Sequence, residues 1–373
     1  MPTIDMPLAE LREYTGSSPR PTDFDEYWNA AERELDALDT RGFREEWVPA
    51  RFQVNYARCW EVYFDGVRGA RLHAKCVMPR GPGATSRDPE GGTGGLDRAA
   101  APMPALFRFH GYTMHAGDWS SLLPYAAAGI AVFALDVRGQ GGESTDPGGL
   151  PGNTQRGHIV RGVEGDPEDL FYRQVFLDTA AVVRMAAAHP EIDADRLGAT
   201  GASQGGALTL ACAALEPRIR AAWAVYPFLS DYRRVWDLEG GESAYEELRH
   251  WLKRRDPRHE HIEEFFTRLG YIDVQHLAER VIANTVVVTG LMDEICPPSS
   301  QFAVYNRLTR AVSRRMTLYP DFGHESLPDA PDLALQWFVE QLGPGDSNGG
   351  GRSGTSGPAG TTGGASSDSG RQE

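Results

Sequence analysis

A serine between two glycines is the part of this sequence that most clearly indicates catalytic chemistry. Residues 201–205 read Gly-Ala-Ser-Gln-Gly, with Ser203 between a predicted strand at 196–200 and a predicted helix at 206–215. Such a strand-to-helix turn exposes the serine hydroxyl at the end of a sheet, and its glycines avoid collisions with neighbouring backbone. The N–H groups that begin the helix also favour negative charge beside the serine. A serine flanked by glycines is usually only a turn, but this strand and helix predict a nucleophile for acyl transfer.

One histidine, His324, is placed to act as the base that this serine needs. A serine hydroxyl is a weak nucleophile until a histidine takes its proton, and in such folds the chain order is serine, acid, histidine. His324 lies between a predicted strand at 315–319 and a predicted helix at 331–341, and Gly323 gives its loop freedom. The other nine histidines precede the serine (His73, His110, His115 and His158) or fall on predicted helices and in a charged segment, where surface positions are expected (His189, His250, His259, His261 and His276).

Asp293 is the expected acid partner of this histidine. It follows a valine-rich predicted strand at 285–291, so its carboxylate emerges at the sheet edge that also carries the serine and histidine loops. Glu294 is its nearest rival. Asp321 is a weaker one, because closeness to His324 in the sequence does not place a carboxylate behind the imidazole. An aspartate after a strand is also a common turn residue, and the chain order is what favours a catalytic role.

Two backbone N–H groups are expected to bind the oxyanion of an acyl-transfer intermediate. One belongs to the residue after the nucleophile, Gln204, and the other to the loop after an early strand. Tyr112 follows the predicted strand at 105–110 and is the natural source of the second group, with His110 and Gly111 in structural roles.

The sequence indicates no metal and no nucleotide cofactor. It contains neither a phosphate-binding loop nor a Gly-x-Gly-x-x-Gly motif. His110 and His115 could suggest a metal, but no carboxylate or cysteine spacing supports it. The four cysteines show no Cys-x-x-Cys spacing, and although Cys59 and Cys76 could face each other on paired strands, two reduced thiols are favoured.

The elements around these motifs alternate between short apolar strands and helices. Two antiparallel strands at 48–64 and 71–78 come first, and the helix at 167–188 is expected to start with Asp166 as its cap. Further strands are predicted at 105–110, 130–136, 196–200, 220–225, 285–291 and 315–319, with helices at 120–128, 206–215, 299–309 and 331–341. This alternation predicts an α/β fold with a mostly parallel, doubly wound sheet.

Two segments interrupt a predicted single domain at 1–342, and a third follows it. A Gly/Pro-rich stretch at 81–102 predicts a flexible surface loop. A polar, charged and helical insertion at 242–279 could cap the site, form an oligomer contact or be a solvated excursion. Residues 343–373 are mainly Gly, Ser, Thr and Pro and predict a disordered tail.

The composition is that of a soluble globular protein with an acidic surface. The 373 residues have a formal net charge of −15, and 41% of them are hydrophobic, which is enough for a substantial core. The charge argues against partners such as nucleic acid or an anionic membrane surface. No secretory signal pattern and no stretch as long as a membrane span is found, so a cytoplasmic protein is expected.

Several segments, taken in order, resemble the acetyl xylan esterase and cephalosporin-C deacetylase family, which is carbohydrate esterase family seven of the α/β-hydrolases. The resemblance covers most of the chain. It rests on an N-terminal arm (6–8 and 21–28), an oxyanion loop (109–112 and 117–119) and three signature motifs (Arg138, Gly139 and Gln140; 201–205; His324 and Glu325).

This resemblance implies an α/β-hydrolase fold and a role for each matching residue. Ser203 would be the nucleophile, Asp293 the acid and His324 the base, with the Tyr112 and Gln204 amides at the oxyanion. Arg138, Gly139 and Gln140 would form a structural motif that braces the loop beneath the nucleophile. The family further implies deacetylation of small acetylated substrates, including xylo-oligosaccharides and cephalosporin C, by hexameric rings whose sites face an inner cavity. The segment at 81–102 and the tail depart from the family pattern and leave the oligomer packing open.

Two other functions stay open at this stage. A serine peptidase of the same fold would use an identical triad, although the chain lacks the repeat domain that often gates such peptidases. A non-catalytic binding protein of this fold would commonly lack one triad member, whereas all three are present here.

Overall fold

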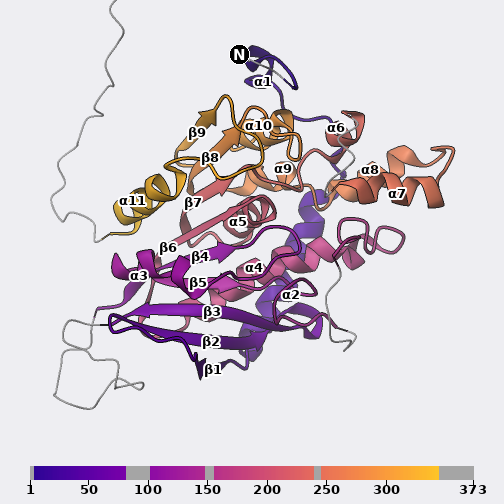
Figure 1. Ribbon diagram of the computed structural model, residues 1–373. Helices are drawn as coiled ribbons and strands as arrows, with labels where there is room; N and C mark the ends of the chain where they lie inside the picture. The colour runs from indigo at the N-terminus through magenta and orange to yellow at the C-terminus, as the bar shows by residue number, and fades with distance from the viewer. Residues whose placement is uncertain (1–3, 81–100, 148–154, 239–244, 344–373) are drawn as a thin grey trace, which may run out of the picture. The chain divides into compact units, whose positions relative to one another are not determined.

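A nine-stranded mixed sheet lies at the centre of the computed structural model, which describes residues 4–80, 101–147, 155–238 and 245–343 (Figure 1). The strand order is β1-β2-β3-β5-β4-β6-β7-β8-β9, with antiparallel pairing from β1 to β5 and parallel pairing from β5 to β9. The predicted fold class is therefore confirmed. The strands are β1 (Glu46–Pro49), β2 (Ala57–Asp65), β3 (Arg71–Pro79), β4 (Met103–Phe109), β5 (Ala131–Leu135), β6 (Ile192–Ala202), β7 (Ile219–Val225), β8 (Asn284–Gly290) and β9 (Arg314–Tyr319).

Helices cover both faces of this sheet, as the apolar composition of its parallel strands requires. Along β7, Ala222 and Ala224 belong to the larger hydrophobic core, whereas Ala221 and Trp223 pack in a separate cluster with the last helix. This alternation is the period of two that directs successive side chains to opposite faces. One face is covered by α2 (Phe24–Arg41), α4 (Phe171–Ala187) and α5 (Gln204–Leu215), and the other by α3 (Leu123–Ala127) and α11 (Ala330–Leu342) (Figure 1).

The N-terminal antiparallel strands differ from the expectation in one detail, and the two cysteines on them are reduced, as favoured. The predicted strand at 48–64 is divided, because residues 50–56 leave the ladder between β1 and β2. Cys59 pairs with Val77 and Cys76 with Trp60, one register apart, so the two thiols point to opposite faces of the sheet. Both cysteines are free thiols.

The long helix before the nucleophile begins later than expected. Residues 167–169 form a short 3-10 turn, and Leu170, with ψ 125°, interrupts the helical path before α4 starts at Phe171. The Asp166 side chain caps neither element. Tertiary packing determines this start, because Phe171 and Tyr172 are both buried in the core.

The insertion between β7 and β8 is helical and packed against the core. It comprises α6 (Tyr232–Asp237), α7 (Glu246–Arg255), α8 (Ile262–Gly270), α9 (Val274–Leu277) and a final 3-10 turn (Ala278–Arg280). Leu252 and Phe266 join the main core, so this segment is more than a solvated excursion. His276, expected at the surface, is buried against Phe24 instead.

The remaining elements are α1 (Leu8–Leu11) and α10 (Pro298–Asn306), together with one 3-10 turn before β3 (Val67–Gly69) and one after β4 (Trp119–Ser121). Of the loop predicted at 81–102 only its last two residues are described, and of the tail predicted at 343–373 only Gly343. The first residues of the insertion, 242–244, also lie outside the described residues. Among the helices of the described ranges, none combines the length and the apolarity that crossing a membrane would need.

A buried histidine between two carboxylates joins the antiparallel strands to the rest of the sheet. His73 on β3 contacts Asp136 Oδ2 through Nδ1 at 2.7 Å and Glu61 Oε2 through Nε2 at 2.8 Å. Carboxylates only accept, so both ring nitrogens must donate and the imidazole is charged. Burial opposes this charge, but the bonds and charges of Asp136 and Glu61 raise the pKa of His73. Asp136 in turn accepts the N–H of Ala116 at 2.6 Å, in the loop after β4.

We predict that His73→Gln lowers the free energy of unfolding by about 3 kcal/mol near pH 6, because it leaves buried carboxylates unpaired. The folded pKa is raised above the unfolded value of about 6.5. Below about pH 6.5 the wild-type ion pairs therefore make their full contribution to the free energy of unfolding. This contribution is lost as the pH rises through the pKa that His73 has in the folded protein. Urea unfolding at several pH values from about 6 to about 9 gives the free energy of unfolding of the wild-type protein and of His73→Gln. His250→Gln, at an exposed position, is the control and should match wild type. A stability difference that does not shrink as the pH rises would contradict this role.

Candidate active site

The candidate nucleophile sits on a strained turn between β6 and α5. Ser203 has φ 59° and ψ −121°, a conformation that non-glycine residues rarely adopt. Its backbone is anchored to the next strand and loop, since its N–H donates to Val225 O at 3.0 Å and its carbonyl accepts from Phe228 N at 3.1 Å. Added Cβ atoms at the flanking glycines would collide with backbone: at Gly201 with Phe109 O at 2.6 Å, and at Gly205 with the same oxygen more closely. The pentapeptide thus needs glycine at both positions.

The structure brings Asp293 and His324 together at the same edge of the sheet. They occupy the loops after β8 and β9, and His324 Nδ1 lies 2.9 Å from Asp293 Oδ2. Asp293 is fully buried, and its other oxygen accepts the N–H groups of Ile295 and Cys296 at 2.9 and 2.8 Å. Because the carboxylate only accepts, Nδ1 carries the proton and Nε2 is left as the basic nitrogen.

The two rival acids lie elsewhere. Glu294 and Asp321 are both exposed, and neither has a hydrogen bond to His324 within the described ranges. The ring of Tyr226 packs against the imidazole, with centroids 4.4 Å apart. Asp293 is therefore the carboxylate that fixes the orientation of this histidine.

The two residues expected to donate to the oxyanion lie at the start of α5 and in the loop after β4. Gln204 is the first residue of α5, and N–H groups in the first helical turn have no partner within the helix. Tyr112 lies in the loop after β4, whose Thr113 N–H donates to Gln140 Oε1 at 2.9 Å. Ser203, His324 and Tyr112 all line one pocket.

A pair of buried glutamine side chains fastens that loop to the nucleophile helix. Gln140 Nε2 donates to Gln204 Oε1 at 2.8 Å, and Tyr172 OH donates to the same oxygen at 2.8 Å. Gln204 Nε2 in turn reaches the carbonyls of His110 and Gly111 at 3.3 and 3.4 Å. The Gln204 side chain thus holds the loop whose next residue is Tyr112.

The other two members of the Arg138, Gly139, Gln140 motif shape the turn that carries Gln140. Arg138 is buried and donates to both oxygens of Asp178 on α4, at 2.6 and 2.7 Å. Gly139 has φ 64°, in the left-handed region that glycine favours. These contacts fix the start of the turn from which Gln140 projects.

His110 takes part in backbone bonding and is not free for a metal. Its Nδ1 donates to Gly111 O at 2.8 Å and its Nε2 accepts from Val137 N at 2.9 Å, so the ring is neutral. Burial lowers the pKa of His110 accordingly. The predicted structural role of this histidine fits these contacts.

One cluster of potential metal ligands occurs among the described residues, and it coincides with the candidate triad. Ligand atoms of Asp293, Cys296 and His324 lie within 4.8 Å of one another. Burial raises the pKa of the Cys296 thiol well above its usual value, which opposes the thiolate that binds metals. The hydrogen bond between Asp293 and His324 also uses two of the ligand atoms. This arrangement suits proton transfer better than metal binding.

Glu247 on α7 contacts this site although nothing in the sequence indicated it. Its Oε1 accepts the Tyr112 hydroxyl at 2.6 Å, and its Oε2 accepts the N–H groups of Ile159 and Val160 at 2.8 and 3.2 Å. Burial raises the pKa of Glu247, but both oxygens act as acceptors, which is the pattern of a carboxylate. In the sequence it is one of many charged residues of a polar helix, so no local signal marks it. The insertion therefore reaches the oxyanion loop.

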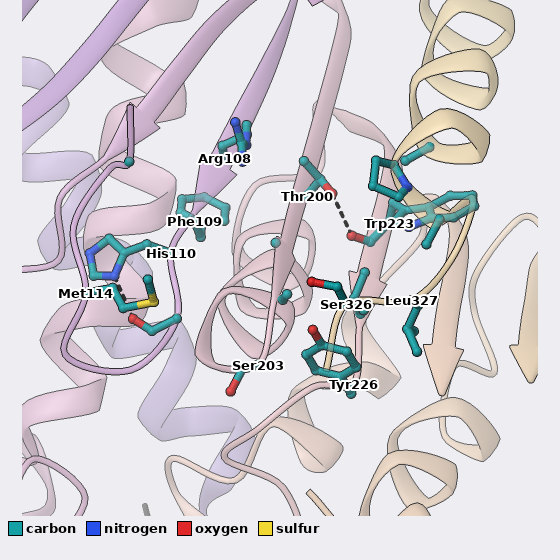
Figure 2. Close-up of a pocket in the computed structure, with 18 of the residues that line it drawn as sticks. Arg108, Phe109, His110, Met114, Thr200, Ser203, Trp223, Tyr226, Ser326 and Leu327 are labelled. Carbon is teal, nitrogen blue, oxygen red and sulfur yellow. Dashed lines mark hydrogen bonds between the residues drawn. The ribbon is translucent and has the colours of Figure 1, made fainter. Parts of the chain in front are cut away.

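The pocket has a volume of about 800 Å³, and its lining includes Tyr125 of α3 and Ala330 and Ala334 of α11. Figure 2 shows 18 of the residues that line it. The pocket is lined by Arg108, Phe109, His110, Gly111, Tyr112, Met114, His115, Ala116, Gly117, Tyr125, Thr200, Gly201, Ala202, Ser203, Trp223, Val225, Tyr226, Ile295, His324, Ser326, Leu327, Ala330, Pro331 and Ala334. Most of this surface is apolar, and an acetyl group would fill only a small part of it.

The sheet, its flanking helices and the placement of serine, aspartate and histidine on three loops at one edge define an α/β-hydrolase. The chain belongs to the acetyl xylan esterase (AXE1) family, whose model matches residues 1–341.

Solved structures of two esterases are similar over nearly their full lengths. Acetyl xylan esterase 1 from Thermoanaerobacterium sp. JW/SL YS485 is 47% identical, with a TM-score of 0.82, and the match covers 90% of this chain and 99% of that one. Acetyl xylan esterase from Paenibacillus sp. R4 is 31% identical, with a TM-score of 0.79, and the match covers 90% of this chain and 100% of that one. Acetyl esterase Axe7A of Xylanibacter ruminicola is 26% identical over 223 residues, which are 58% of this chain and 48% of that protein. The match thus spans about half the length of this curated relative.

We predict that Glu247→Gln lowers kcat roughly tenfold, because an amide cannot accept hydrogen bonds at both ends and would release the Tyr112 loop. KM should change less, since Glu247 does not line the pocket. Steady-state kinetics with p-nitrophenyl acetate gives both values, and thermal unfolding shows whether the variant is folded.

Glu246→Gln is the matched control on the same helix, where Glu246 pairs with exposed Arg156. It should keep the wild-type kcat. A Glu247→Gln variant that also keeps the wild-type kcat would contradict the positioning role.

Proposed function

We propose that this protein is a serine esterase that removes acetyl groups from small substrates through an acyl-enzyme at Ser203. The observation that carries the proposal is the hydrogen-bonded Asp293–His324 pair at the pocket that Ser203 lines, in a chain of the acetyl xylan esterase family. A binding protein of this fold would not need this arrangement.

In the proposed reaction each of these groups has one role. Ser203 Oγ attacks the acetyl carbonyl carbon while His324 Nε2 takes its proton, and Asp293 stabilises the charged imidazole. The N–H groups of Gln204 and Tyr112 bind the oxyanion. When the intermediate collapses, the alcohol leaves with the proton from His324. Water then attacks the acetyl-enzyme with the same base, and acetate is released.

The substrate class, assembly and location are parts of this proposal. The pocket is far larger than an acetyl group, which supports substrates with a bulky alcohol part, such as acetylated xylo-oligosaccharides and cephalosporin C. We propose a homo-oligomer, a hexamer by family resemblance, located in the cytoplasm, with neither nucleic acid nor membrane as a partner. The formal net charge of −15 supports the last point. Solution mass tests the assembly.

We predict that Ser203→Ala lowers kcat for p-nitrophenyl acetate by at least about a thousandfold, because it removes the nucleophile. Ser313→Ala, at an exposed serine on the loop before β9, is the control and should keep the wild-type rate. A Ser203→Ala variant with wild-type turnover would overturn the proposed mechanism.

Two further measurements separate the competing functions. Labelling by a fluorophosphonate distinguishes an activated serine from a binding-only protein, which would not react. Acetyl esters and aminoacyl amides distinguish an esterase from a peptidase of the same fold. Preference for the amides would overturn the proposed reaction while leaving the triad intact.

A further inference from the structure

The charge of the pocket is opposite to that of the protein. The chain contains 52 Asp and Glu residues against 37 Lys and Arg. No Asp or Glu occurs among the lining residues within the described ranges, whereas Arg108 and three histidines do. His110 is neutral by its hydrogen bonds, so Arg108 is the permanent charge of this pocket. Asp293, the carboxylate bonded to His324, is fully buried and does not line the pocket.

Arg108 is held in place but keeps donors free. Its Nη1 donates to the carbonyl and the hydroxyl of Ser121, at 2.9 and 3.1 Å, which orients the guanidinium. Its Nε and Nη2 groups have no acceptor among the described residues, and no ion pair to Arg108 occurs there either. A guanidinium with free N–H groups is suited to hold a carboxylate.

Arg108 is separated from the candidate nucleophile by a distance that a small ester could span. On β4 it is in register with Thr200 on β6, three residues before Ser203. At about 3.3 Å per strand residue, the two positions are roughly 10 Å apart along the sheet. Figure 2 shows Arg108 and Ser203 toward opposite ends of the pocket, with Thr200 between them in height. An acetyl group at Ser203 therefore leaves the alcohol part of the ester to extend toward Arg108.

We propose that, among the acetyl esters that it hydrolyses, this protein prefers those whose alcohol part carries a carboxylate, and that Arg108 binds that carboxylate. The inference rests on the proposed esterase function and adds the chemical class of the substrate. A single positive charge fits one carboxylate, and the apolar surface around Trp223 and Leu327 fits the carbon framework between the two ends.

The test compares charged and neutral esters of the same shape. The probes are ω-acetoxyalkanoates of increasing chain length and the primary amides of the same acids, and acetate release gives kcat and KM for each. The wild-type protein should prefer the carboxylate over its amide by roughly tenfold in kcat/KM, mainly through KM, at the chain length that spans about 10 Å. High salt should reduce this preference, since screening weakens charge pairs that water reaches.

Two variants of Arg108 test whether this residue causes the preference for carboxylate over amide esters. Arg108→Gln should bring the ratio of carboxylate to amide close to one, and Arg108→Lys should keep part of the preference because the charge remains. Thermal unfolding checks that both are folded, and the salt dependence of the wild-type protein tests the inference without any variant. An unchanged ratio in Arg108→Gln, or no wild-type preference at any chain length, would overturn the inference. If the wild-type protein releases no acetate from any probe, including p-nitrophenyl acetate, the proposed esterase function itself fails.

Discussion

The site depends on a contact made by backbone atoms alone, where the ends of β4 and β6 meet the first turn of α5. Gly201 and Gly205 press against the Phe109 carbonyl with no room for a side chain. This closeness brings the loop that follows Phe109 beside the first N–H groups of the helix. The strained conformation of Ser203 costs about 1–3 kcal/mol, and contacts with the surrounding structure must offset this cost. The structure does so through α5, which is buried along its whole length, and through hydrogen bonds from Ser203 to the β7 region.

Polar side chains then convert this backbone contact into a defined site. The Gln204 side chain, bonded to Gln140, donates to the oxyanion loop at His110. Glu247, in the helical insertion, accepts the Tyr112 hydroxyl of the same loop. Asp136 binds the same loop further along, at Ala116, and is itself paired with His73 on β3. Each of these groups is buried or nearly so, where an unmatched polar group is costly, so the bonds favour one loop conformation.

Some of this arrangement could be predicted from the sequence, because it follows from local rules. Glycines around Ser203, alternating strands and helices, and the order of serine, aspartate and histidine indicated the fold and the three loops that carry the candidate triad. The predictions that failed depend on tertiary packing. Nothing near Asp166 reveals that burial of Phe171 and Tyr172 delays the start of α4. No local pattern marks Glu247 either, since its partners lie far away in the sequence. Arg108 is notable only because none of the described residues that line the pocket is acidic.

Trapping the acyl-enzyme is the most direct test of Ser203 as the nucleophile. The wild-type protein is mixed with p-nitrophenyl acetate, quenched with acid within the first turnover, digested and examined by mass spectrometry. We expect one acetyl group on the peptide that contains Ser203, appearing at the rate of the p-nitrophenol burst. An acetyl group on another residue at that rate, or a burst with no acetylated peptide, would contradict this role of Ser203.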